Sequence, residues 1–61
     1  MTINTEIQCR AILENMRIEA TLAEWCRAND NYEMMQRHSA TVEQMRGEIE
    51  SLIDSDRRPG L

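Results

Sequence analysis

The chain has 61 residues and a formal net charge of −4 at pH 7, so it forms one domain at most. The acidic charge argues against nonspecific binding to nucleic acids and to anionic membranes, because both require basic patches, and no apolar run is long enough to cross a bilayer. Aromatic residues make up 3% of the chain, and a chain of this length buries only about 60% of its unfolded surface. A second copy is therefore the expected source of further core.

Residues 1–4 form either a frayed lead-in or part of a short strand at residues 2–5, whose backbone would need a partner strand from a second copy. A helix is predicted over residues 5–28, because this segment contains no glycine or proline. Thr5 and Gln8 have the spacing of a capping box, in which Thr5 is the N-cap.

The first predicted helix carries two apolar stripes, whereas a surface helix in a simple hairpin needs one. Because the second helix of the hairpin covers one stripe, the other stripe requires a partner from outside the monomer. Gln8, Asn15 and Glu19 lie between the stripes. The first stripe holds Cys9, Ile12, Leu13, Met16, Ala20 and Ala23. The second stripe holds Ile7, Ala11, Ile18, Leu22 and Trp25, with Cys26 beside it.

Residues 28–31 form the predicted turn, since asparagine and aspartate tolerate left-handed backbone. Asp30 is the predicted N-cap of a second helix over residues 31–53, and Glu33 completes a capping box. Apolar residues of this helix recur at alternating steps of three and four, the a/d repeat of helices that pack along a seam. The seam of the second helix consists of Met35, His38, Val42, Met45, Ile49 and Leu52. It is expected to pack against Ile12, Leu13 and Met16 of the first helix.

Residues 54–61 are predicted to form a disordered polar tail, because Pro59 disfavours helical backbone at Arg58. Cys9 and Cys26 lie about 25 Å apart along one helix, which is too far for a disulfide. We interpret them as reduced core residues, and they indicate a reducing compartment. The N-terminus also lacks the pattern of a signal peptide, so a cytosolic location is expected.

His38 is the polar residue of the predicted seam. We interpret it as a residue that fixes the register of the helices; a pH-sensitive interface residue and a metal ligand beside Cys26 are the alternatives. A structural zinc site needs about four ligands at recognisable spacing, so no metal or cofactor is expected. The sequence contains neither a serine beside a histidine nor a glycine-rich phosphate loop, so it predicts a protein that is not an enzyme.

A hydrophobic cleft for a partner protein is predicted near the turn, since methionine adapts to varied partners and tryptophan anchors protein interfaces. For Trp25 itself burial beside the turn is the preferred interpretation and a binding anchor is the alternative, and for the methionines ordinary core filling is preferred over an adaptable groove. The candidate cleft residues are Ile18, Leu22, Trp25 and Met34.

A resemblance to a phage protein family is carried by the sequence TINTEIQCRAILENMRIEATLAEWCRAND and its continuation NYEMMQRHSATVEQMRGEIESLIDSDRRPGL. The chain resembles the small early proteins that lambdoid bacteriophages encode between the exo and xis genes. The resemblance lies in the overall sequence and not in a functional motif. It implies a non-enzymatic protein that is expressed early in infection, in the bacterial host cytoplasm, and favours lytic development. It also implies a dimer with two helices and one strand per chain.

Together these features predict a mainly α fold, an antiparallel two-helix hairpin with or without a short N-terminal strand, that dimerises into a four-helix bundle. The predicted function is a homodimeric protein-interaction module that binds an unidentified host or phage protein. One alternative is a DNA-binding transcriptional regulator of the ribbon-helix-helix type, whose paired strands enter the major groove, although residues 2–5 carry no cation. Another alternative is a purely structural assembly subunit.

Overall fold

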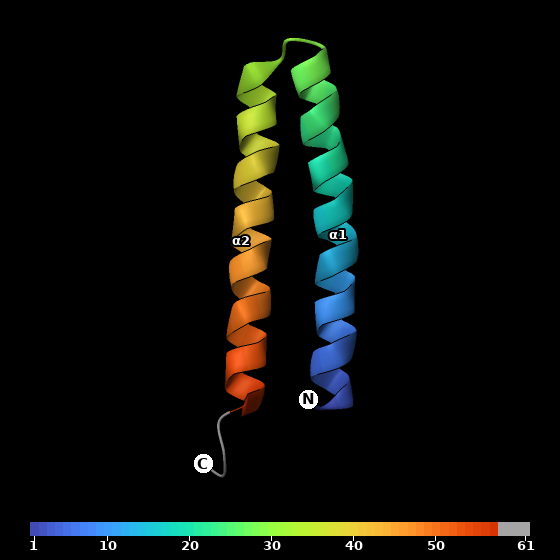
Figure 1. Ribbon diagram of the computed structural model, residues 1–61, viewed down its shortest axis with the longest axis vertical. Coiled ribbons are helices and arrows are strands. Elements are labelled where there is room, and N and C mark those ends of the chain that lie inside the picture. Colours follow the sequence, from blue (N-terminus) through green and yellow to red (C-terminus); the bar gives the residue numbers. More distant parts are fainter. Residues whose placement is uncertain (58–61) are drawn as a thin grey trace.

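The computed structural model describes residues 1–57 and shows a helical hairpin (Figure 1). Helix α1 spans Ile3–Ala28 and helix α2 spans Tyr32–Arg57, and the two helices run antiparallel, side by side, over their whole length. The molecule is long and thin, with principal extents of 49 × 16 × 8 Å. The predicted antiparallel two-helix hairpin is therefore confirmed.

Helix α1 begins earlier than predicted because Thr2, and not Thr5, is its N-cap. The Thr2 Oγ1 atom accepts a hydrogen bond of 3.2 Å from the Thr5 backbone N–H, which satisfies one of the donors that a helix start leaves free. The short strand considered for residues 2–5 is not formed, since the helix already includes Ile3. No strand occurs within residues 1–57, so this range lacks the ribbon that the DNA-binding alternative requires.

The chain reverses direction at residues 29–31. Asp30 has a φ of 60°, a left-handed conformation that aspartate tolerates better than most residues. The Asn31 N–H donates to the Cys26 carbonyl oxygen at 2.8 Å, which closes the end of α1. Asn31 then precedes α2, and its Oδ1 atom accepts a hydrogen bond of 3.4 Å from the Met34 N–H. The N-cap of α2 is thus Asn31 and not the predicted Asp30, because Asp30 occupies the left-handed position of the turn.

Helix α2 continues to Arg57, beyond the predicted end at residue 53. Residues 54–57 were expected to be disordered, but they are helical because Asp56 bonds to the first turn of α1 across the open end of the hairpin. The rest of the predicted tail, residues 58–61, lies outside the described residues.

The two helices meet along a seam that uses alternating third and fourth residues, as in a coiled coil. The residues of α2 on this seam are all half-buried, and only the small side chains of α1 are fully covered. On α1 the seam runs through Thr5, Cys9, Ile12, Met16, Glu19, Ala23 and Cys26. On α2 it runs through Met35, His38, Val42, Met45, Ile49, Leu52 and Asp56.

The core along this seam is thin. Its buried residues are Cys9, Ala23 and Cys26, and no large side chain within residues 1–57 is fully buried. Burial contributes about 0.8 kcal/mol per CH₂ group, whereas ordering the backbone costs about 1–2 kcal/mol per residue. The hairpin therefore buries little apolar surface for the number of residues that it orders.

Candidate functional site

An uncovered apolar surface follows one side of α1, which we call the outer face. Trp25 is 67% exposed, and Ile7 and Ile18 are 59% and 54% exposed. Side chains of this size contribute about 1.5–3 kcal/mol each when they are fully buried, so their exposure leaves substantial stabilisation unused. The outer face consists of Ile7, Ala11, Ile18, Leu22 and Trp25.

Two predicted positions differ from the structure. Trp25 is not buried beside the turn, because it lies on the outer face and α2 covers the opposite side of α1. Leu13 was expected in the seam but is 48% exposed, because the seam passes through Ile12 and Met16, and Leu13 follows Ile12 by about 100° around the helix. The other predicted seam residues are all half-buried: Ile12, Met16, Met35, His38, Val42, Met45, Ile49 and Leu52.

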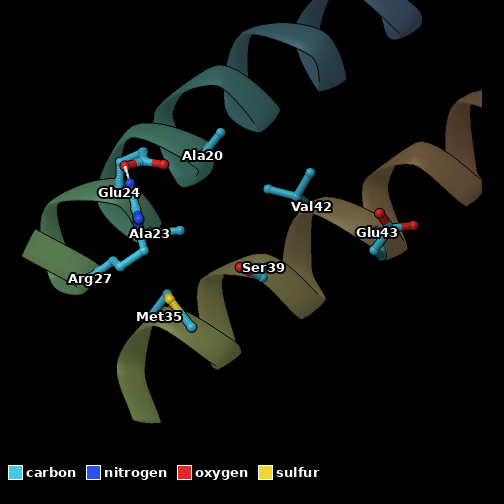
Figure 2. Close-up of a pocket in the computed structure, with 8 residues that line it drawn as sticks. All are labelled: Ala20, Ala23, Glu24, Arg27, Met35, Ser39, Val42 and Glu43. Atoms are coloured by element: carbon cyan, nitrogen blue, oxygen red, sulfur yellow. Dashed lines mark hydrogen bonds and ion pairs between the residues drawn. The ribbon is translucent and has the colours of Figure 1, made fainter. Parts of the chain in front are cut away.

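A hollow of about 370 Å³ opens between α1 and α2 near the turn (Figure 2). Small side chains create it, since Ala20 and Ala23 of α1 and Ser39 of α2 leave the space between the helices unfilled. Met35 and Val42 add apolar walls, as Figure 2 shows. Glu24, Arg27 and Glu43 complete the lining, and Glu24 and Arg27 form an ion pair of 2.7 Å.

A second hollow lies on α1 alone, in the middle of the outer face. Its volume is about 330 Å³. Ile18 and Leu22 supply its apolar part. Its remaining lining consists of Glu14, Arg17 and Thr21. Of the four predicted cleft residues, Ile18 and Leu22 therefore share a hollow, whereas neither Trp25 nor Met34 lines either of these two hollows.

A polar pair interrupts the seam at mid-length. His38 Nδ1 lies within hydrogen-bonding distance of Glu19 Oε2, and these two side chains are 21% and 25% exposed. The pair therefore joins α1 to α2 at the middle of the seam. Within residues 1–57, no three histidine, cysteine or acidic residues are grouped closely enough to hold a metal ion, so His38 and Cys26 do not form part of such a group.

Asp56 joins the two ends of the hairpin. Its carboxylate accepts hydrogen bonds from the Thr2 backbone N–H at 3.1 Å and from the Thr5 hydroxyl at 3.0 Å. These hydrogen bonds, first the one from the Thr2 N–H, lower the pKa of Asp56 below its ordinary value. The start of α1 also carries the positive end of the helix dipole, which favours the charged carboxylate.

We expect Asp56→Asn to lower the thermal unfolding midpoint by a few degrees at pH 7, because the amide accepts these hydrogen bonds less well than the carboxylate. A lowered pKa stabilises the fold above the ordinary aspartate pKa, and this contribution is lost as the pH falls through the folded-state pKa. The difference between the variant and the wild type should therefore shrink below about pH 4. Circular dichroism melts at several pH values measure this difference. Glu50→Gln is the control, since Glu50 is an exposed acid on α2 whose ion pair with Arg46 lies within its own helix. An equal, pH-independent loss in both variants would contradict the role of Asp56.

Comparisons of this chain with protein-family models, with curated proteins and with solved structures found no match. Neither α1 nor α2 is apolar enough along its length to cross a membrane.

Sequence reasoning missed two residues that bridge the helices. Glu19 was placed between the apolar stripes, yet it lies on the seam and bonds to His38. The sequence spacing could have placed Glu19 on the seam, because Glu19 is three residues after Met16 and four residues before Ala23 and so fits the alternating three-and-four spacing. Asp56 was assigned to the tail, although it follows Leu52 by four residues and Ile49 by seven.

Proposed function

We propose that this chain is a homodimeric, non-enzymatic protein-interaction module. The observation that carries the proposal is the exposed outer face of α1, where Ile7, Ile18 and Trp25 are each more than half exposed. Covering a few hundred Å² of apolar surface at about 25 cal/mol per Å² stabilises a protein by several kcal/mol. This is comparable with the whole stability of a small domain. A second hairpin that covers this face completes a four-helix bundle.

The dimer leaves a separate surface for another protein. None of the residues that line the hollow between α1 and α2 belongs to the outer face, although Glu24 of its rim lies next to that face. The apolar part of the hollow therefore stays open when a second copy covers the outer face. Its floor is apolar and its rim carries Glu24, Arg27 and Glu43. Such a surface suits an apolar side chain presented by a helix with charged neighbours. We propose this hollow as the contact site for a host or phage protein.

The biological setting follows from the resemblance of the sequence to the small early proteins of lambdoid phages. On that basis the module acts in the cytoplasm of the bacterial host and promotes lytic development. It does so by binding its partner and not by catalysis.

Sedimentation equilibrium at low micromolar concentration tests the dimer. The expected mass is twice 7.1 kDa, and a folded monomer under these conditions would contradict the proposal. The partner surface is tested with Ala20→Arg, which fills the hollow between the helices without touching the outer face. Wild-type protein captured from infected cells should retain a host or phage protein that the Ala20→Arg variant loses. If both proteins retain the same set, the hollow is not the contact site, and a dimer that retains nothing specific is a structural assembly subunit.

A further inference from the structure

We infer that the second copy binds the outer face with its own α1, and that the two α1 helices run antiparallel about a two-fold axis near Arg17. This inference rests on the proposed homodimer and specifies its orientation. It places the two α1 helices at the centre of the assembly and the two α2 helices on the outside.

The position of the apolar surface requires this arrangement. The outer face lies about 130° around α1 from the seam, at 100° per residue, so a helix that covers it cannot be the α2 of the same hairpin. No comparable apolar row follows α2, whose exposed large apolar side chains are Tyr32 and Met34, both in its first turn. The apolar surface that a second copy can offer over the full length of α1 is therefore its own outer face.

Charges along the edge of the outer face select the antiparallel direction. They follow the order Glu6, Arg10, Glu14, Arg17 and Glu24. In an antiparallel pair this edge meets the same edge of the second copy. With the axis near Arg17, Arg10 faces Glu24 of the other chain, an opposite-charge contact that occurs twice by symmetry. Arg17 lies beside the Arg17 of the other chain at the axis, and Glu14 of each chain lies one turn away. In a parallel pair the charged edge meets the opposite edge, where Gln8 and Asn15 offer no charge.

The sizes of the side chains on the outer face also fit the antiparallel direction. The same axis brings Ile7 opposite Trp25, and Ala11 opposite Leu22, of the second copy, so that large side chains meet small or medium ones. The hollow around Ile18 then lies close to the axis. Its lining includes Glu14 and the residues three, four and seven positions after it, which are Arg17, Ile18 and Thr21. Four residues with this spacing form the hole into which a facing helix inserts a side chain.

Charge reversal tests the orientation. Arg10→Glu and Glu24→Arg should each weaken homodimerisation about fivefold at low salt, because each replaces two attractive contacts by two repulsive ones. When the two variants are mixed, both contacts of the heterodimer become attractive again. Native mass spectrometry of the mixture should therefore show heterodimer above the statistical half, and high salt should reduce this excess. The double variant Arg10→Glu/Glu24→Arg should dimerise like the wild type, which shows that the single changes do not act through misfolding.

The matched control is a mixture of Arg46→Glu and Glu43→Arg. These two substitutions change the net charge of each chain by the same amounts as Arg10→Glu and Glu24→Arg, but they lie on α2, away from the outer face. This mixture should contain heterodimer at the statistical half. A statistical distribution for both mixtures, or an equal excess in both, overturns the antiparallel pairing of α1 while the homodimer stands. A wild type that stays monomeric overturns the homodimer itself, and the inferred orientation with it.

Discussion

Replacing Ile18 by glutamate is expected to convert the dimer into monomers. Ile18 is 54% exposed on the isolated hairpin, and burying it contributes about 2 kcal/mol per copy. The variant loses this contribution twice and places two carboxylates in an apolar contact. We therefore expect the dimer Kd to rise by at least a factor of about 1,000, since every 1.4 kcal/mol changes Kd about tenfold. Sedimentation velocity over a concentration series measures the change.

Leu13→Glu is the matched control for this substitution. Leu13 is similarly exposed, at 48%, but it precedes Ile18 by five residues and so lies about 140° away around α1. Its replacement should leave the dimer Kd within about threefold, the range of an ordinary surface substitution. If Leu13→Glu dissociates the dimer as strongly as Ile18→Glu does, the second copy covers a different side of α1.

The second large effect is expected at the polar pair of the seam. His38→Leu should destabilise the fold by about 1–3 kcal/mol, because it leaves the Glu19 side chain, which is three-quarters covered, without its partner on α2. The double variant Glu19→Leu/His38→Leu should recover this loss and exceed the stability of the wild type, because replacing a covered polar pair by apolar side chains is often stabilising. Urea unfolding at one fixed protein concentration measures both differences.

The same pair is expected to set how the helices align. Polar residues inside a helical seam fix register at some cost in stability. If the pair fixes the register of α1 against α2, the double variant should unfold over a broader range of urea concentration than the wild type, because its helices can align in more than one way. If the double variant instead loses as much unfolding free energy as the two single variants lose together, Glu19 and His38 stabilise the fold independently.

Much of the hairpin could be predicted from the sequence because its pattern is local. The three-and-four spacing from Met35 to Leu52 identifies α2, and the asparagine and aspartate residues at positions 29–31 identify the turn. The excess apolar surface of α1 was also visible, since its second stripe corresponds to the outer face that the structure leaves exposed.

The ends of the helices and the polar contacts were harder to predict because they depend on residues that are far apart in the sequence. Thr2 and Asp56 are separated by 54 positions, and their contact both starts α1 early and extends α2. The burial of Glu19 depends on its pairing with His38, whereas sequence spacing alone treats a glutamate as a surface residue. Trp25 was hard to place because its size favours burial, yet its position on the helix directs it away from α2.

The dependence of the unfolding midpoint on protein concentration tests the central claim most directly. A fold that needs a second copy to cover its outer face unfolds together with dissociation, so its midpoint must rise with concentration. We expect the thermal midpoint of the wild type to rise by several degrees for each tenfold increase in concentration, and Ile18→Glu to lack a cooperative unfolding transition at the same concentrations. A wild-type midpoint that is independent of concentration, at the mass of a single chain, would show that one hairpin is stable with its outer face exposed and would contradict the account.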